Sequence, residues 1–135
     1  VISADVLVGL ARSGRLNVIV SHGHGDHYDA EFCRKLAGAR FFVPQFRDRH
    51  MERLMPEATV IRGRVEVGGC ILASMEGPHS ALVIIEAPDC SVVHANDIYT
   101  LPEGGTARLA AMPPDKPVFF MGQGGSALER CRASR

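Results

Sequence analysis

The most informative stretch of the sequence is Ser21-His22-Gly23-His24-Gly25-Asp26-His27-Tyr28-Asp29. It carries three imidazoles and one carboxylate within six consecutive residues, directly after the apolar run Leu16–Val20. Neutral imidazole and ionised carboxylate are the side chains that zinc, iron and manganese accept as ligands. Half of the 6 histidines of the chain fall in this hexapeptide beside an aspartate, so the stretch predicts a metal site rather than chance surface polarity.

The two glycines of the loop are expected to help the ligands meet. Gly23 and Gly25 lack a Cβ, which lets the backbone turn tightly enough for neighbouring side chains to converge. An apolar run followed by a polar loop also suggests a site at the mouth of a sheet, where α/β folds usually place their chemistry. Asp29, at the end of the stretch, is assigned to capping the following helix rather than to binding metal.

Composition narrows the class of protein. A chain of 135 residues with 46% hydrophobic and 22% charged residues fits one soluble domain, residues 1–135. Its 15 basic and 15 acidic residues balance, which favours neither nucleic acid nor an anionic membrane as partner. No apolar stretch approaches the roughly 20 residues of a membrane span. The four cysteines form no CxxC pair, so we expect free thiols in a cytoplasmic protein, with Cys90 a weak candidate ligand.

Periodicity and turn residues predict an alternation of helices and strands, typical of α/β layering with helices covering a sheet. The expected helical segments are Ala4–Arg12 (capped by Ser3 or Asp5), Asp29–Leu36, Gln45–Leu54, a turn at Thr106–Met112, and Ser126–Arg132. The expected strands are Leu16–Val20 (buried), Ala39–Val43, Thr59–Ile61, Val65–Val67, Cys70–Ser74, Ala81–Ala87, Ser91–Ala95 and Val118–Met121.

The pattern His22-x-His24-x-Asp26-His27 resembles the signature loop of the metallo-β-lactamase-fold hydrolases. The resemblance implies an αββα sandwich in which the first two histidines bind one metal ion, while the aspartate and third histidine bind a second. It also implies a later histidine for the first ion, an aspartate that bridges both ions, and a last histidine for the second ion. The motif is specific to this superfamily and says almost nothing about which member the chain resembles.

Two later residues match the ligands that the resemblance implies. His79, in Gly77-Pro78-His79 between two predicted strands, takes the place of the histidine that completes the first site. Glu76 is a rival there, and a carboxylate would favour an iron-like site. Asp97 follows a predicted strand and takes the place of the bridging aspartate. His94, at odd separation from Asp97 on that strand, is expected to face away or to act behind the ligands, and His50 to lie on the surface.

The sequence departs from the family pattern at both ends. No histidine follows His94, and Gln123 stands where the last ligand would be, although a neutral amide binds these metals weakly. Family members also carry several strands ahead of the histidine loop, which this sequence lacks. We therefore expect an incomplete sandwich: a fragment of a longer protein, a minimal single-metal branch, or a chain completed by a partner. A sheet without its neighbouring layer would expose an apolar face, which favours self-association.

The function that these residues predict is metal-dependent hydrolysis of a small-molecule ester, lactone, amide or phosphoester. One or two zinc ions, or iron or manganese, would generate hydroxide from water at neutral pH, and Asp26 would align that water or take its proton. Two alternatives stay open. One is a di-iron enzyme of the same fold that uses oxygen. The other is a degenerate module that binds metal without catalysis.

Overall fold

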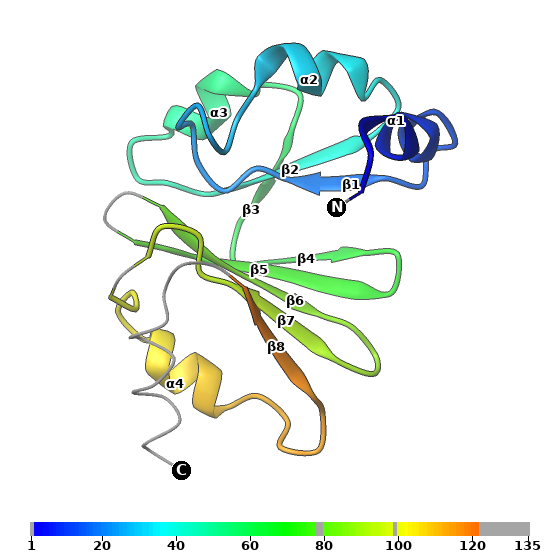
Figure 1. Cartoon of the computed structure of the whole chain (residues 1–135). Helices are drawn as coiled ribbons and strands as arrows, with labels where there is room; N and C mark the ends of the chain where they lie inside the picture. The colour runs from blue at the N-terminus through cyan, green and yellow to red at the C-terminus, as the bar shows by residue number, and fades with distance from the viewer. Residues whose placement is uncertain (1, 78–79, 99, 122–135) are drawn as a thin grey trace. The chain divides into compact units, whose positions relative to one another are not determined.

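The computed structural model describes residues 2–77, 80–98 and 100–121, and the chain divides into two compact units. Unit 1 comprises residues 1–60 and unit 2 comprises residues 61–135. Each unit contains helices and its own sheet, so the protein is a mixed α/β protein with two sheets (Figure 1). The two units are described separately below.

Unit 1 builds a three-stranded sheet with strand order β1-β2-β3 and helices α2 and α3 on the same side of it (Figure 1). Strands β1 and β2 are parallel, with Asn17 opposite Arg40 and Ile19 opposite Phe42. A parallel pair needs a crossover connection, which α2 supplies. The elements are α1 (Ala4–Arg12), β1 (Asn17–Ile19), α2 (Ala30–Lys35), β2 (Arg40–Pro44), α3 (His50–Leu54) and β3 (Thr59–Ile61), which spans the division.

The helix starts of unit 1 follow the predicted capping. The side chain of Ser3 accepts a hydrogen bond from the backbone N–H of Val6 at 3.4 Å, at the start of α1. Asp29 accepts from the backbone N–H groups of Glu31 and Phe32 at 2.8 and 3.0 Å, at the start of α2. Its carboxylate therefore satisfies two donors that have no partner within the helix.

Two expectations for unit 1 were wrong in detail. The predicted helix Gln45–Leu54 begins only at His50, because Arg49 adopts a left-handed conformation with φ 55° and cannot continue a right-handed helix backwards. The predicted strand Leu16–Val20 is shortened to β1, and its Val18 and Ile19 are only half-buried. Strand β1 lies at the edge of its sheet, so it is not the interior strand that a continuous apolar run suggests.

Unit 2 is a five-stranded sheet with strand order β4-β5-β6-β7-β8. The first four strands form an antiparallel meander, and the crossover through α4 returns β8 parallel to β7. The elements are β4 (Arg64–Val67), β5 (Cys70–Glu76), β6 (Ala81–Glu86), β7 (Ser91–His94), α4 (Gly105–Ala110) and β8 (Val118–Met121). The predicted helix Ser126–Arg132 lies outside the described residues.

The core of unit 2 forms where α4 packs on one face of the sheet (Figure 1). Because side chains alternate along a strand, every second residue of β5, β6 and β7 faces this core. The residues that α4 covers are apolar, and they are joined by Ile98 just after β7. The buried cluster consists of Ala73, Leu82, Ile84, Val93, Ala95, Ile98, Leu109 and Met112.

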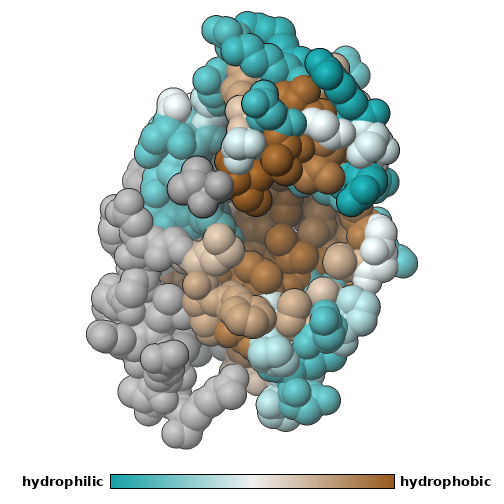
Figure 2. Space-filling model, turned by 45° about the vertical axis from the view of Figure 1, so that its right-hand side comes forward, coloured by the Kyte–Doolittle hydropathy of each residue, from teal (hydrophilic) through white to brown (hydrophobic). Residues whose placement is uncertain are grey.

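Apolar side chains are also accessible at the surface. Figure 2 shows brown apolar atoms at the surface, with teal hydrophilic atoms beside them. Among the described residues, the large hydrophobic side chains that are exposed include Ile2, Val6, Leu54, Phe119, Phe120 and Met121. Exposed apolar area favours association, and the expected self-association stays a prediction.

None of the helices in residues 2–77, 80–98 and 100–121 has both the length and the apolar character needed to cross a membrane.

Candidate metal centre

Three imidazoles of unit 1 lie against one another in the loop that follows β1. The ring centroids of His22 and His24 are 4.6 Å apart, and those of His22 and His27 are 4.2 Å apart. His22 is buried, with 1% of its surface exposed, whereas His24 is exposed and His27 half-buried. A backbone turn brings them together, because His24 C=O accepts from the N–H groups of both His27 and Tyr28 at 2.9 and 2.8 Å.

Two of these ring nitrogens, one from His22 and one from His24, are placed as ligands of one cation would be. His22 Nε2 and His24 Nδ1 are 3.0 Å apart. Two nitrogens bound to a single ion at about 2.0–2.1 Å are separated by about 2.8–3.4 Å when the angle at the ion is between a right angle and the tetrahedral value. Ligand nitrogens of His22 and His27 also lie within 4.8 Å of each other. The donor set of unit 1 therefore fits a zinc-like ion.

The second nitrogen of His22 is held by its neighbour in sequence. Ser21 Oγ lies 3.0 Å from His22 Nδ1, and both residues are buried. A hydroxyl can accept from the protonated Nδ1, which leaves the lone pair of Nε2 to bind a cation. This contact was not anticipated from the sequence, and the position of Ser21 directly before the first histidine was the available signal.

The carboxylates of the loop differ in their surroundings. Asp26 Oδ2 lies 3.5 Å from His27 Nε2, and the Asp26 side chain is 77% exposed. An exposed carboxylate can meet water and substrate from the solvent side. Asp29 is engaged at the start of α2, as expected from its assignment as a cap.

The two glycines of the loop differ in what their lack of a Cβ allows. Neither Gly23 nor Gly25 has a positive φ, so the loop does not use their conformational freedom. A Cβ at Gly23 would lie 3.0 Å from Leu54 Cδ2, whereas a Cβ at Gly25 would meet nothing within 4 Å. Gly23 therefore makes room for α3, and the fold places no demand on Gly25.

Unit 2 carries Asp97 on a tight turn directly after β7. Residues 96 and 97 form the turn, and Ile98 N–H donates to Ala95 C=O at 2.9 Å. Asn96 has φ 49°, one of two positive values among the described non-glycine residues. It is 6% exposed, and its amide Nδ2 donates to Ala81 C=O at 2.8 Å, which ties the turn to the start of β6.

The expectation for His94 assumed that the alternation of side chains along the strand continues as far as Asp97. It does not. Strand β7 ends at His94, and the left-handed residue Asn96 reverses the chain before Asp97. Val93 and Ala95 belong to the core beneath α4, so His94 lies on the other face of the sheet. Asn96 N–H donates to His94 Nδ1 at 3.1 Å, which links the histidine to this turn.

The remaining candidate ligands are His79, Gln123, Glu76 and Cys90. His79 and Gln123 fall outside the described residues. Glu76 is the exposed last residue of β5. Cys90 precedes β7 and Asp97 follows it, so the length of that strand, about 13 Å, separates them. Burial and then Asp89 raise the pKa of the Cys90 thiol, which weakens it further as a ligand.

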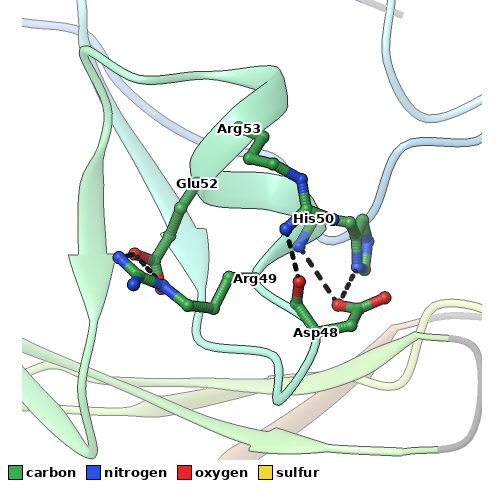
Figure 3. A network of polar contacts seen from close by, with 5 residues as sticks. All are labelled: Asp48, Arg49, His50, Glu52 and Arg53. Atoms are coloured by element: carbon green, nitrogen blue, oxygen red, sulfur yellow. Dashed lines mark hydrogen bonds and ion pairs between the residues drawn. The ribbon is translucent and has the colours of Figure 1, made fainter.

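A charged network surrounds the start of α3, away from the loop histidines in sequence (Figure 3). His50 Nδ1 donates to Asp48 Oδ1 at 2.7 Å, and this hydrogen bond lowers the pKa of the Asp48 carboxyl. Arg49 donates to Glu52 Oε2 through Nε and Nη2, at 3.0 and 2.6 Å. His50 is thus a partly exposed residue with a carboxylate partner, which refines its assignment to the surface.

Beside this network lies an open pocket of about 460 Å³, lined by Arg49, Glu52, Arg53, Pro56, Ala58 and Val60. Arg49 is paired with Glu52, and Arg53 donates to Asp48 C=O at 2.7 Å. Both guanidinium groups are therefore already engaged by the protein, and the pocket offers no obvious reactive group.

Comparison with solved structures shows a likeness in fold. No protein-family model and no curated protein sequence matches the chain. The crystal structure of a possible metal-dependent hydrolase from Veillonella parvula DSM 2008 is similar over 89% of this chain, with a TM-score of 0.54 and 20% sequence identity. This chain spans 65% of the length of that protein. The likeness shows a shared fold.

Proposed function

We propose that this chain forms a metal-dependent hydrolase centre of the metallo-β-lactamase type. The proposal joins the resemblance of the histidine loop to the fold likeness with a possible metal-dependent hydrolase. The observation that carries it is the 3.0 Å separation of His22 Nε2 and His24 Nδ1 within a packed group of three imidazoles.

The chemistry of the donor set favours zinc, with iron or manganese as the other candidates. His22 and His24 would hold the first ion together with His79, and Asp26 and His27 would hold a second. Asp97 is the further ligand that the resemblance implies. When bound, such an ion lowers the pKa of water to about 7 and polarises a carbonyl or phosphoryl oxygen.

The residues of the loop would have distinct tasks around that chemistry. Ser21 Oγ, 3.0 Å from His22 Nδ1, fixes the ring so that Nε2 presents its lone pair. The exposed Asp26 carboxylate is open to solvent, where it can accept a proton from water. His22 is buried, so the packing around it would restrict rotation of its ring.

The proposed substrate is a small molecule with an ester, lactone, amide or phosphoester bond. The loops around a metal centre set its selectivity, and those loops carry no readable code in one sequence.

The test is a substrate panel. The wild-type protein, loaded in turn with zinc, manganese or iron, is assayed on one substrate of each of the four bond classes. We expect hydrolysis of at least one class that disappears in His24→Ala and is removed by a chelator. His50→Ala is the matched control, because it deletes a histidine of the same unit that lies outside the loop, and we expect it to retain activity.

Two results would overturn the proposal. One is the absence of metal-dependent turnover on every class despite bound metal, which would favour a non-catalytic metal-binding module. The other is oxygen consumption by the iron-loaded protein without hydrolysis, which would favour the oxygen-using alternative.

A further inference from the structure

We propose that Asn96 is the residue that positions Asp97, and that it also sets the tautomer of His94. This inference rests on the proposed function for the role of Asp97 as a ligand. The arrangement itself lies wholly within unit 2, so it can be tested in the metal-free protein.

The first step is the backbone of the turn. Asn96 sits at φ 49°, in the left-handed region that most side chains disfavour and asparagine tolerates better. This conformation turns the chain immediately after β7 and presents Asp97 beyond the end of the strand. A residue that avoids this region would pull residues 95–98 toward an extended path and move the carboxylate.

The second step is the side chain that holds the turn in place. Asn96 is buried, and its amide Nδ2 donates to Ala81 C=O at 2.8 Å and lies 3.4 Å from His94 C=O. Ala81 is the first residue of β6 and is itself fully buried. The amide thereby fixes the turn against a rigid strand, and a ligand held in this way needs less rearrangement on binding.

The third step concerns the histidine. Asn96 N–H donates to His94 Nδ1 at 3.1 Å, so Nδ1 must carry a lone pair. In the neutral ring the proton then resides on Nε2. A neutral ring in this tautomer cannot give a lone pair at Nε2 to a metal ion, so we assign His94 as a hydrogen-bond donor and not as the last histidine ligand that the resemblance implies.

The experiment compares three substitutions of Asn96 with a control substitution on β6, the strand whose Ala81 C=O accepts from the Asn96 amide. Asn96→Gly keeps the left-handed backbone and removes the amide. Asn96→Ala removes both, and Asn96→Asp keeps the shape but sets a carboxylate against Ala81 C=O. The control is Glu86→Gln at the opposite end of β6, where Glu86 accepts from Arg64 at 2.9 Å and from Arg108. It perturbs unit 2 without touching the turn.

Two readouts are measured. The first is the tautomer of His94, read from the ¹⁵N imidazole signals of the metal-free protein. The second is zinc affinity, measured by competition with a chromogenic chelator. For the wild type and Glu86→Gln we expect the Nε2–H tautomer and zinc affinities within about twofold of each other. For Asn96→Ala and Asn96→Asp we expect a mixed tautomer and zinc held about 10–100-fold more weakly. Asn96→Gly should fall between them.

The outcomes separate this inference from the proposed function. A wild-type His94 with its proton on Nδ1 overturns the inference whether or not metal binds. If Asp97→Ala weakens zinc binding but no Asn96 variant does, the inference is wrong while the metal centre stands. If the wild type binds no zinc, the proposed function fails, and the tautomer measurement alone then decides whether Asn96 organises the turn. Should Asn96→Ala not fold, Asn96→Gly and Asn96→Asp carry the same comparison.

Discussion

The loop after β1 and the turn after β7 place polar side chains at the ends of strands by different means. The loop of unit 1 concentrates its three histidines within one hexapeptide, and neither of its glycines adopts a positive φ. The turn of unit 2 presents one carboxylate, and it depends on a left-handed asparagine whose amide reaches another strand. A loop that contains several ligands can therefore be recognised from its residues alone. A single ligand such as Asp97 depends on a hydrogen bond from its neighbour to another strand, and the sequence does not show that bond.

The largest expected effect concerns the histidine loop of unit 1. His22 is the buried member of the imidazole group and contacts both Ser21 and His24. We expect His22→Ala to lower kcat/KM of the zinc-loaded protein by more than about a hundredfold, because outer partners of a ligand already contribute 10–100-fold. Steady-state kinetics on the substrate identified by the panel would measure this. Retention of wild-type activity would contradict the assignment of His22.

The next effect concerns the stability of the second region. Asn96→Ala leaves the buried Ala81 C=O without this donor and places alanine at a left-handed φ. We expect the free energy of unfolding of unit 2 to fall by about 2–3 kcal/mol in Asn96→Ala. In Asn96→Gly the loss should be smaller by about 1 kcal/mol, because glycine tolerates the left-handed φ. Urea unfolding, with hydrogen exchange of the β6 and β7 amides to assign the change to unit 2, would measure both. Equal losses in the two variants would show that the left-handed backbone does not matter.

A smaller effect distinguishes the glycines of the histidine loop. A Cβ at Gly25 meets nothing within 4 Å, so Gly25→Ala should change the free energy of unfolding by less than about 0.5 kcal/mol. A Cβ at Gly23 would press on the flexible, exposed Leu54 side chain, so Gly23→Ala should be destabilising by up to about 1 kcal/mol. Gly38→Ala is the informative contrast. It combines φ 97° with a Cβ only 2.6 Å from Ala11 O, and it should be more destabilising than both.

The smallest effect lies outside both regions. The hydrogen bond from His50 lowers the pKa of the exposed Asp48 carboxyl below its unfolded value of about 3.9. A carboxyl with a depressed folded pKa stabilises the native state above the unfolded pKa, and this contribution is lost as the pH falls through the folded value. We expect His50→Gln to raise the pKa of Asp48, measured by NMR titration of its carboxyl carbon. An unchanged titration curve would show that the contact is not formed in solution.

Much of the fold could be predicted from the sequence, because its signals are local. Strand Val118–Met121 and helix Ala4–Arg12 have the predicted bounds, and Ser3 and Asp29 cap as their positions suggest. The start of α3 could not be predicted, because it depends on a left-handed Arg49 and on Asp48, whose Oδ1 accepts from the backbone N–H of His50 at 3.1 Å. Such a local bond competes with helix formation and leaves no clear trace in the hydrophobic pattern.

The candidate site divides in the same way. The ligand types of His22, His24, Asp26 and His27 were readable because six consecutive residues hold all four of them. The contact of Asn96 with Ala81 joins residues 15 positions apart through a strand register, and no local pattern specifies that register. Asparagine before Asp97 was the available signal, since it is among the few side chains that tolerate a left-handed turn.

The central claim is that the histidine loop binds a catalytic cation, and the metal content of the purified protein tests it most directly. The protein would be prepared without added metal, incubated with zinc, freed of excess by gel filtration, and analysed by mass spectrometry beside His24→Ala and His50→Ala. We predict at least one zinc ion per chain in the wild type and in His50→Ala, and a loss of bound zinc in His24→Ala. A wild type that retains no zinc, manganese or iron under these conditions would contradict the account.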